Sequence, residues 1–300
     1  MRYETTHNLT SHISHFISHT LTMSYQEYRP SGFNVLPPVV KNLLIINGIF
    51  YLATVLFELK MNIDLEGILG LHYFFSDAFR PYQLVTYMFM HGSFGHIFFN
   101  MFALWMFGNT LENIWGAKKF LIYFIVTGIG AALLHYTVHY FEIQPTLNML
   151  NDYIINQDIS NFEKMFQPLM QKIHATSKME NLINQYNSIA DNLPEKIQVS
   201  VELVKQYKIE FLNAPVVVGA SGSVFGLLLA FGMMFPNSMI YMYFLFPIKA
   251  KWFVIFYGAI ELFGAVNPSQ GDNIAHYAHL GGMLFGFILI KYWDKNRKHL

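Results

Sequence analysis

Cysteine is absent from the 300 residues of this chain. The protein therefore has no disulfide, no thiolate nucleophile and no cysteine metal site, and its redox compartment cannot be inferred. Charge is scarce too: charged residues are 13% of the chain, and the formal net charge is zero. A neutral chain has no overall field that attracts nucleic acid, so we expect no nucleic-acid partner.

A cleavable signal peptide is also not expected, because the first long apolar run begins near Leu43 and lacks a small-residue cleavage site. Apolar residues, by contrast, are abundant: 53% of the chain is hydrophobic and 17% is aromatic. This composition predicts a polytopic membrane protein with some water-exposed sequence attached, and hence the lipid bilayer as a partner.

The fold class we predict is an all-α polytopic membrane protein, a bundle of six transmembrane helices with an extra helical insert. The predicted spans are residues 39–57, 94–111, 120–140, 216–235, 252–266 and 274–290. The predicted domains are an N-terminal extension (1–38), a membrane domain (39–293) interrupted by a water-exposed insert (142–213), and a basic tail (294–300).

The segments outside the spans differ in amino-acid composition. Residues 1–22 are polar, and we interpret their four histidines as part of a disordered extension rather than a metal-binding tract; either Met1 or Met23 could be the true start. Residues 61–90 are semi-apolar and aromatic, which favours a position in the membrane interface. The insert has apolar residues at helical spacing and predicts a hairpin of helices, with Pro194 as a break. The four histidines are His7, His12, His15 and His19.

Basic residues outside the spans predict the orientation. With six spans, Lys118 and Lys119, Lys249 and Lys251, and the C-terminal cluster all fall on one side. Cytoplasmic loops are enriched in lysine and arginine, so we expect both termini in the cytoplasm and the insert outside. The expected location is a bacterial inner membrane.

Polar groups inside the predicted spans gather at one depth. Ser221 lies at the outer end of the fourth span, His279 lies near the outer end of the sixth, and His96 and Asn100 lie in the outer half of the second. Such groups are costly in a membrane and are functional candidates by default. Histidine is the common general base for a serine nucleophile, which makes Ser221 and His279 a candidate catalytic pair.

Matching glycines predict how that pair could meet. Gly222-x-x-x-Gly226 in the fourth span parallels Gly282-x-x-x-Gly286 in the sixth, and small residues at this spacing let helix backbones touch. His276, one turn before His279, is an alternative base. It ranks second because the glycine spacing follows His279 directly.

A carboxylate beside His279 is not evident in the sequence. Asp272 lies in a loop and Glu261 lies in the fifth span; either could orient the imidazole, but we favour a Ser–His dyad without a carboxylate. Glu112, at the inner end of the second span, is interpreted as structural. No cofactor and no metal are expected.

Donors for an oxyanion hole are available in the second span. His96 and Asn100 share one helix face, and the backbone N–H of Ser221 near a helix start would add a third donor. Interhelical hydrogen bonding is the alternative role, particularly for Asn100. His91 more simply ties down the preceding connector.

Three motifs in this order resemble the rhomboid family of intramembrane serine proteases, over residues 39–293. The motifs are His91-x4-His96-x3-Asn100, Gly219-Ala220-Ser221-Gly222 and Ala278-His279-Leu280-Gly281-Gly282. The resemblance implies a serine-type endopeptidase that acts on transmembrane protein substrates. The oligomeric state is not predicted.

The resemblance also implies roles for single residues. Ser221 would be the nucleophile, His279 the base, His96 and Asn100 oxyanion residues, and His91 a structural residue. Phe225, one turn after Ser221, would pack under the imidazole, with Gly219 and Gly222 as supporting glycines. Three departures stand out: Arg80-Pro81-Tyr82-Gln83-Leu84 replaces a more usual tryptophan-containing segment, Ser223 replaces a frequent alanine, and the insert is long.

Other functions are less well supported. A non-catalytic relative of the same fold would not need both Ser221 and His279. A transporter would be expected to show an internal repeat or acidic groups along a pathway, and neither is seen. A soluble α/β-hydrolase is excluded because its elbow requires Gly-x-Ser-x-Gly and position 223 is serine.

Overall fold

The computed structural model describes residues 33–170, 176–214, 216–242, 246–267 and 275–297. The chain divides into two units, residues 1–34 and 35–300, and everything below concerns the second. The four N-terminal histidines, Met1, Met23 and Asp272 lie outside the described residues, as does most of the predicted extension.

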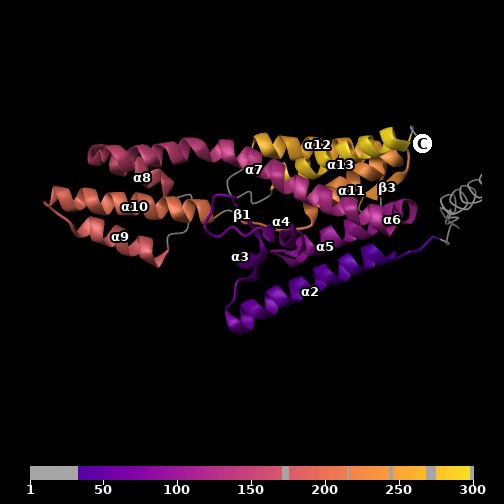
Figure 1. Ribbon diagram of the computed structural model, residues 1–300, viewed down its shortest axis with the longest axis horizontal. Helices are drawn as coiled ribbons and strands as arrows, with labels where there is room; N and C mark the ends of the chain where they lie inside the picture. The colour runs from indigo at the N-terminus through magenta and orange to yellow at the C-terminus, as the bar shows by residue number, and fades with distance from the viewer. Residues whose placement is uncertain (1–32, 171–175, 215, 243–245, 268–274, 298–300) are drawn as a thin grey trace, which may run out of the picture. The chain divides into compact units, whose positions relative to one another are not determined.

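Each of the six predicted spans contains a helix, and the described residues are mostly helical, as predicted (Figure 1). Two helices, α2 and α7, are long and apolar enough to cross a membrane by length and composition, whereas α11 is apolar but has only 14 residues. The helices of the spans are α2 (Pro38–Met61), α5 (Phe94–Ala103) continued by the π-helix η2 (Leu104–Gly108) and α6 (Asn109–Trp115), α7 (Ala117–Asn156), α11 (Ser221–Met234), α12 (Ala250–Val266) and α13 (His276–Arg297).

The predicted boundary between the third span and the insert is not a helix end. Helix α7 runs unbroken through residues 140–142 and contains Pro145 in its interior. The prediction located a change from apolar to polar side chains. That change marks a change of surroundings. The helix continues because Ile143, Leu150 and Tyr153 recur at helical spacing and are buried on one face.

The insert is more than the predicted hairpin. Helices α8 (Phe162–Leu169), α9 (Ser177–Ser188) and α10 (Leu193–Asn213) follow the short 3-10 turn η3 (Ile159–Asn161) and pack with the far end of α7 around a separate apolar core. Pro194 lies in the first turn of α10, so the predicted break falls at a helix junction. The buried core residues are Leu150, Tyr153, Phe162, Phe166, Leu169, Met179, Tyr186, Val199, Val201, Leu203, Val204 and Tyr207.

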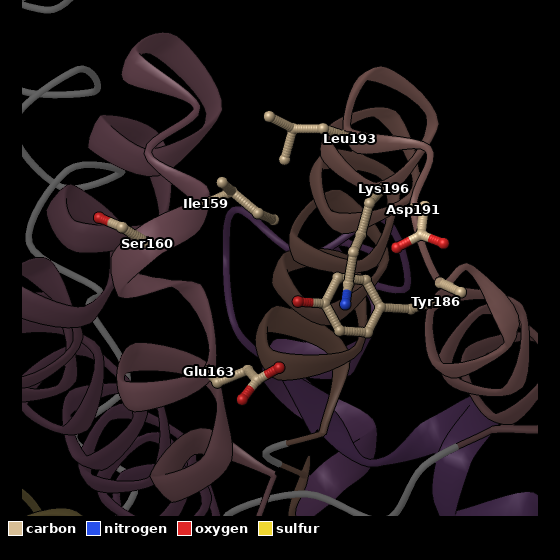
Figure 2. A pocket seen from close by; sticks show the side chains of 8 residues that line it. Ile159, Ser160, Glu163, Tyr186, Asp191, Leu193 and Lys196 are labelled. Atoms are coloured by element: carbon tan, nitrogen blue, oxygen red, sulfur yellow. The ribbon is translucent and has the colours of Figure 1, made fainter.

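A hollow of about 500 Å³ opens on the insert between η3 and the junction of α9 with α10 (Figure 2). The Lys196 ammonium lies 4.9 Å from the centre of the Tyr186 ring, a cation–π distance. Burial, with the Glu163 carboxylate as a further cause, raises the pKa of Tyr186 to about 12. The hollow therefore presents a protonated hydroxyl at neutral pH.

Short antiparallel strands connect the loops. Strand β1 (Leu71–His72) pairs with β2 (Val216–Val217), and the carbonyl of Tyr87 accepts the N–H of Gly219 at 2.8 Å. The connector between the first two spans, which also contains α3 (Leu65–Leu69), α4 (Gln83–Thr86) and η1 (Tyr87–Phe89), therefore holds the backbone just before Ser221. After the fourth span, β3 (Met239–Met242) pairs in antiparallel fashion with β4 (Phe246–Lys249).

Glu112 joins two helices at the other end of the bundle. Its carboxylate accepts the backbone N–H groups of Val39 at 2.9 Å and Val40 at 2.7 Å. These two groups begin α2 and have no acceptor within that helix, and a negative charge there also complements the helix dipole. This geometry agrees with the structural interpretation of Glu112.

Candidate active site

Ser221 is the first residue of α11 and lies two residues after a glycine with an unusual backbone conformation. Gly219 has φ of +122°, and a Cβ added to it would lie 2.6 Å from His96 Nε2. A residue with a side chain would be strained there and would also clash. The sharp turn after β2 directs Ser221 toward α13, and its Oγ lies 2.8 Å from Nε2 of His279.

Glycine residues let α11 and α13 pack closely enough for this serine and this histidine to meet. A Cβ on Gly282 of α13 would lie 1.8 Å from the carbonyl oxygen of Gly222 on α11, so the two backbones are in contact. The predicted contact between the two glycine faces is therefore present at this pair. Gly226 also faces α13, because a Cβ there would lie 3.1 Å from the carbonyl oxygen of Gly282. Gly286 differs, because a Cβ on it would meet the Tyr123 hydroxyl of α7 at 2.3 Å.

Phe225 packs face to face against the His279 ring. The two rings are stacked, with centroids 4.2 Å apart and planes 10° apart. Phe225 lies one turn after Ser221 on α11, so the helix that carries the serine also fixes the plane of the imidazole.

Glu261 of α12 lies beside His279, and the preference for a dyad without a carboxylate needs correction. The Glu261 carboxylate oxygen Oε2 lies 2.9 Å from His279 Nδ1 and 2.7 Å from His276 Nδ1. A carboxylate accepts, so Nδ1 of His279 donates and its Nε2 is left as an acceptor facing Ser221. His276, the alternative base, bonds to Glu261 instead of to Ser221.

One sequence signal pointed to Glu261: it is an acidic residue within an otherwise apolar span. Its partner could not be deduced, because Glu261 and His279 are on different helices and only the packing of α12 on α13 places them together. The loop that contains Asp272, the other carboxylate considered, is outside the described residues.

The oxyanion candidates border the same turn. A Cβ on Gly219 would lie 3.6 Å from Asn100 Nδ2, so both side chains of α5 face the backbone two residues before Ser221. Asn100 is buried, and its Nδ2 has no hydrogen-bond partner among the described residues. Leaving a buried donor unpaired costs about 1–3 kcal/mol, so this amide is kept at a cost that a bound acceptor would remove.

His91 lies behind this group. It is buried, and its ring packs edge-to-face on His96 with centroids 4.9 Å apart. It contacts the oxyanion candidate rather than the serine, and its structural role stays a prediction.

Fold and site together define a helical membrane protein in which a serine, a histidine and a glutamate from three helices are linked by hydrogen bonds. The model of the rhomboid domain matches residues 78–143 and 197–294, more than half of the chain. The chain therefore belongs to the rhomboid family, a family of intramembrane proteases, and is an integral membrane protein. Residues 144–196, between the matched segments, fall outside the match. No curated protein matches the chain.

Proposed function

We propose that this protein is an intramembrane serine endopeptidase that hydrolyses peptide bonds in or near transmembrane segments of other membrane proteins. The observation that carries the proposal is the 2.8 Å hydrogen bond between Ser221 Oγ and His279 Nε2. A hydroxyl is a weak nucleophile until a base removes its proton, and this geometry supplies that base.

The mechanism follows from the contacts of the two residues. Ser221 Oγ attacks the carbonyl carbon of the substrate while its proton passes to His279 Nε2. The same proton then moves to the leaving amine, and a water molecule, activated by His279, hydrolyses the acyl-enzyme. Glu261 acts as a positioning residue: it holds Nδ1–H of His279 and stabilises the imidazolium that forms.

The negative oxygen of the tetrahedral intermediate needs donors that already point at it. These donors are Asn100 Nδ2, the His96 ring and the free N–H groups at the start of α11.

We expect Asn100→Ala to lower kcat by about 10²–10³ with little change in KM. The thermal midpoint should hold or rise, because the variant removes an unpaired buried amide. A lower midpoint with normal kcat would instead favour the interhelical hydrogen-bonding role.

Substrates must expose a carbonyl that a helix normally uses for its own hydrogen bonds. A proline destabilises a helix interior by about 3 kcal/mol, so it should ease local unwinding. The lysine distribution supports cytoplasmic termini, which puts Ser221 near the outer surface of the membrane, which we propose to be a bacterial inner membrane.

Three matched membrane substrates test this function. One has a proline near the outer end of its transmembrane helix, one has it near the cytoplasmic end, and one has an uninterrupted helix. We expect the first to be cleaved about tenfold faster or more than the other two by the protein in membranes. Equal cleavage of the two proline substrates would contradict the proposed depth, and cleavage of none would contradict the function.

A further inference from the structure

Three metal-ligating groups converge on the side of His279 that faces away from Ser221. The ligand atoms of Glu261, His276 and His279 all lie within 4.8 Å of one another. The two imidazole Nδ1 atoms point at the same carboxylate oxygen, at 2.7 and 2.9 Å. Two histidines and one carboxylate are a ligand set of catalytic zinc sites, with a fourth position left for water.

The three ligand atoms lie within about 1.5 Å of the separations that a tetrahedral zinc ion requires. Zinc binds imidazole nitrogen and carboxylate oxygen at about 2.0–2.2 Å, which puts tetrahedral ligand atoms about 3.3 Å apart. Each of the two nitrogen–oxygen contacts would need to open by about 0.5 Å, and the two nitrogens, which lie within 4.8 Å of each other, would need to approach by up to about 1.5 Å. The side chains are 9–11% exposed, so the site is sheltered without being sealed.

The surroundings also hold the ligands in place. His276 and His279 are one turn apart on α13, and Glu261 comes from the adjacent α12. A Cβ on Gly264 of α12 would lie 2.5 Å from the His276 ring, so the lack of a side chain there makes room for that ring. Phe225 stacks on the His279 ring and so fixes the plane of that ring.

We propose that Glu261, His276 and His279 bind a zinc ion, and that zinc bound there reversibly inhibits peptide hydrolysis. Binding stands on the ligand geometry alone, whereas inhibition rests on the proposed function. Zinc on Nδ1 of His279 takes the lone pair of that atom, and the single proton of the neutral ring must then sit on Nε2. Nε2 faces Ser221 and becomes a donor, so it can no longer accept the serine proton.

Zinc binding and zinc inhibition are measured separately on the purified full chain. Binding is followed by equilibrium dialysis of the chelator-treated protein against Zn²⁺, and inhibition by cleavage of the outer-proline substrate with added Zn²⁺. The polar segment of residues 1–22 contains four further histidines, which can bind zinc themselves. The comparison is therefore made with His276→Ala, which leaves that segment intact, and each variant is normalised to its own zinc-free rate.

We expect His276→Ala to bind one zinc ion fewer than the wild type and to need at least about tenfold more zinc for half-inhibition. His139→Ala, a histidine of α7 paired at 3.9 Å with Glu142, is the matched control and should behave as the wild type. A chelator should restore the wild-type rate.

Equal zinc stoichiometry in the wild type and His276→Ala would overturn the site. Loss of one ion without any difference in inhibition would overturn the inhibitory role. If the zinc-free protein cleaves no substrate, the proposed function fails, while the dialysis result still decides the zinc site.

Discussion

Replacing Ser221 with alanine should lower the cleavage rate by about 10⁴–10⁶-fold, to the background of the assay. The hydroxyl is the atom that bonds to the substrate, and no neighbouring group can replace it. A fluorophosphonate probe, which reacts only with activated serines, should label the wild type and fail to label Ser221→Ala. His279→Ala should also lose labelling, because its hydrogen bond activates the serine.

Ser223→Ala is the matched control for this result. Ser223 lies two residues further along α11, is fully buried, and donates to the carbonyl of Phe124 at 2.7 Å. Its loss should cost about 1 kcal/mol of stability and leave cleavage and labelling in place. Cleavage by Ser221→Ala at the wild-type rate would refute the assignment of the nucleophile.

Glu261→Gln should lower kcat by about 10²–10⁴-fold while KM stays nearly constant. An amide has the size of the carboxylate but no negative charge, so the imidazolium formed during catalysis loses its partner. The amide can also turn its NH₂ toward Nδ1 of His279. Nδ1 then accepts a hydrogen bond and the ring proton lies on Nε2, which can no longer accept the serine proton. Steady-state kinetics on the outer-proline substrate measure kcat and KM, and the thermal midpoint is recorded in parallel to detect any loss of stability.

The same substitution at Glu112 provides the contrast. Glu112→Gln weakens the two hydrogen bonds to the start of α2, so its effect should be on the thermal midpoint, with kcat close to the wild type. If Glu261→Gln retains kcat within about threefold, the dyad alone suffices and the carboxylate does not orient the base.

The sequence predicted the helices of the membrane domain because long apolar runs have few other solutions in a bilayer. It predicted Ser221 and His279 because a polar group in such a run is costly and needs a reason. The end of the third helix could not be predicted from the polarity change at Glu142, since a change of polarity does not end a helix and α7 continues to Asn156. The separate core of the insert likewise depends on how α8, α9 and α10 pack on α7.

Residue types and their spacing alone determined that this is a helical membrane protein with a candidate serine–histidine pair, because each signal lies within one helix. Tertiary structure decided what surrounds the pair: the Gly222–Gly282 backbone contact, the stacking of Phe225 on His279, and the Glu261 carboxylate between two imidazoles. Glu261 and His279 come from different helices, and no periodicity within one helix reports which face of the next helix it meets.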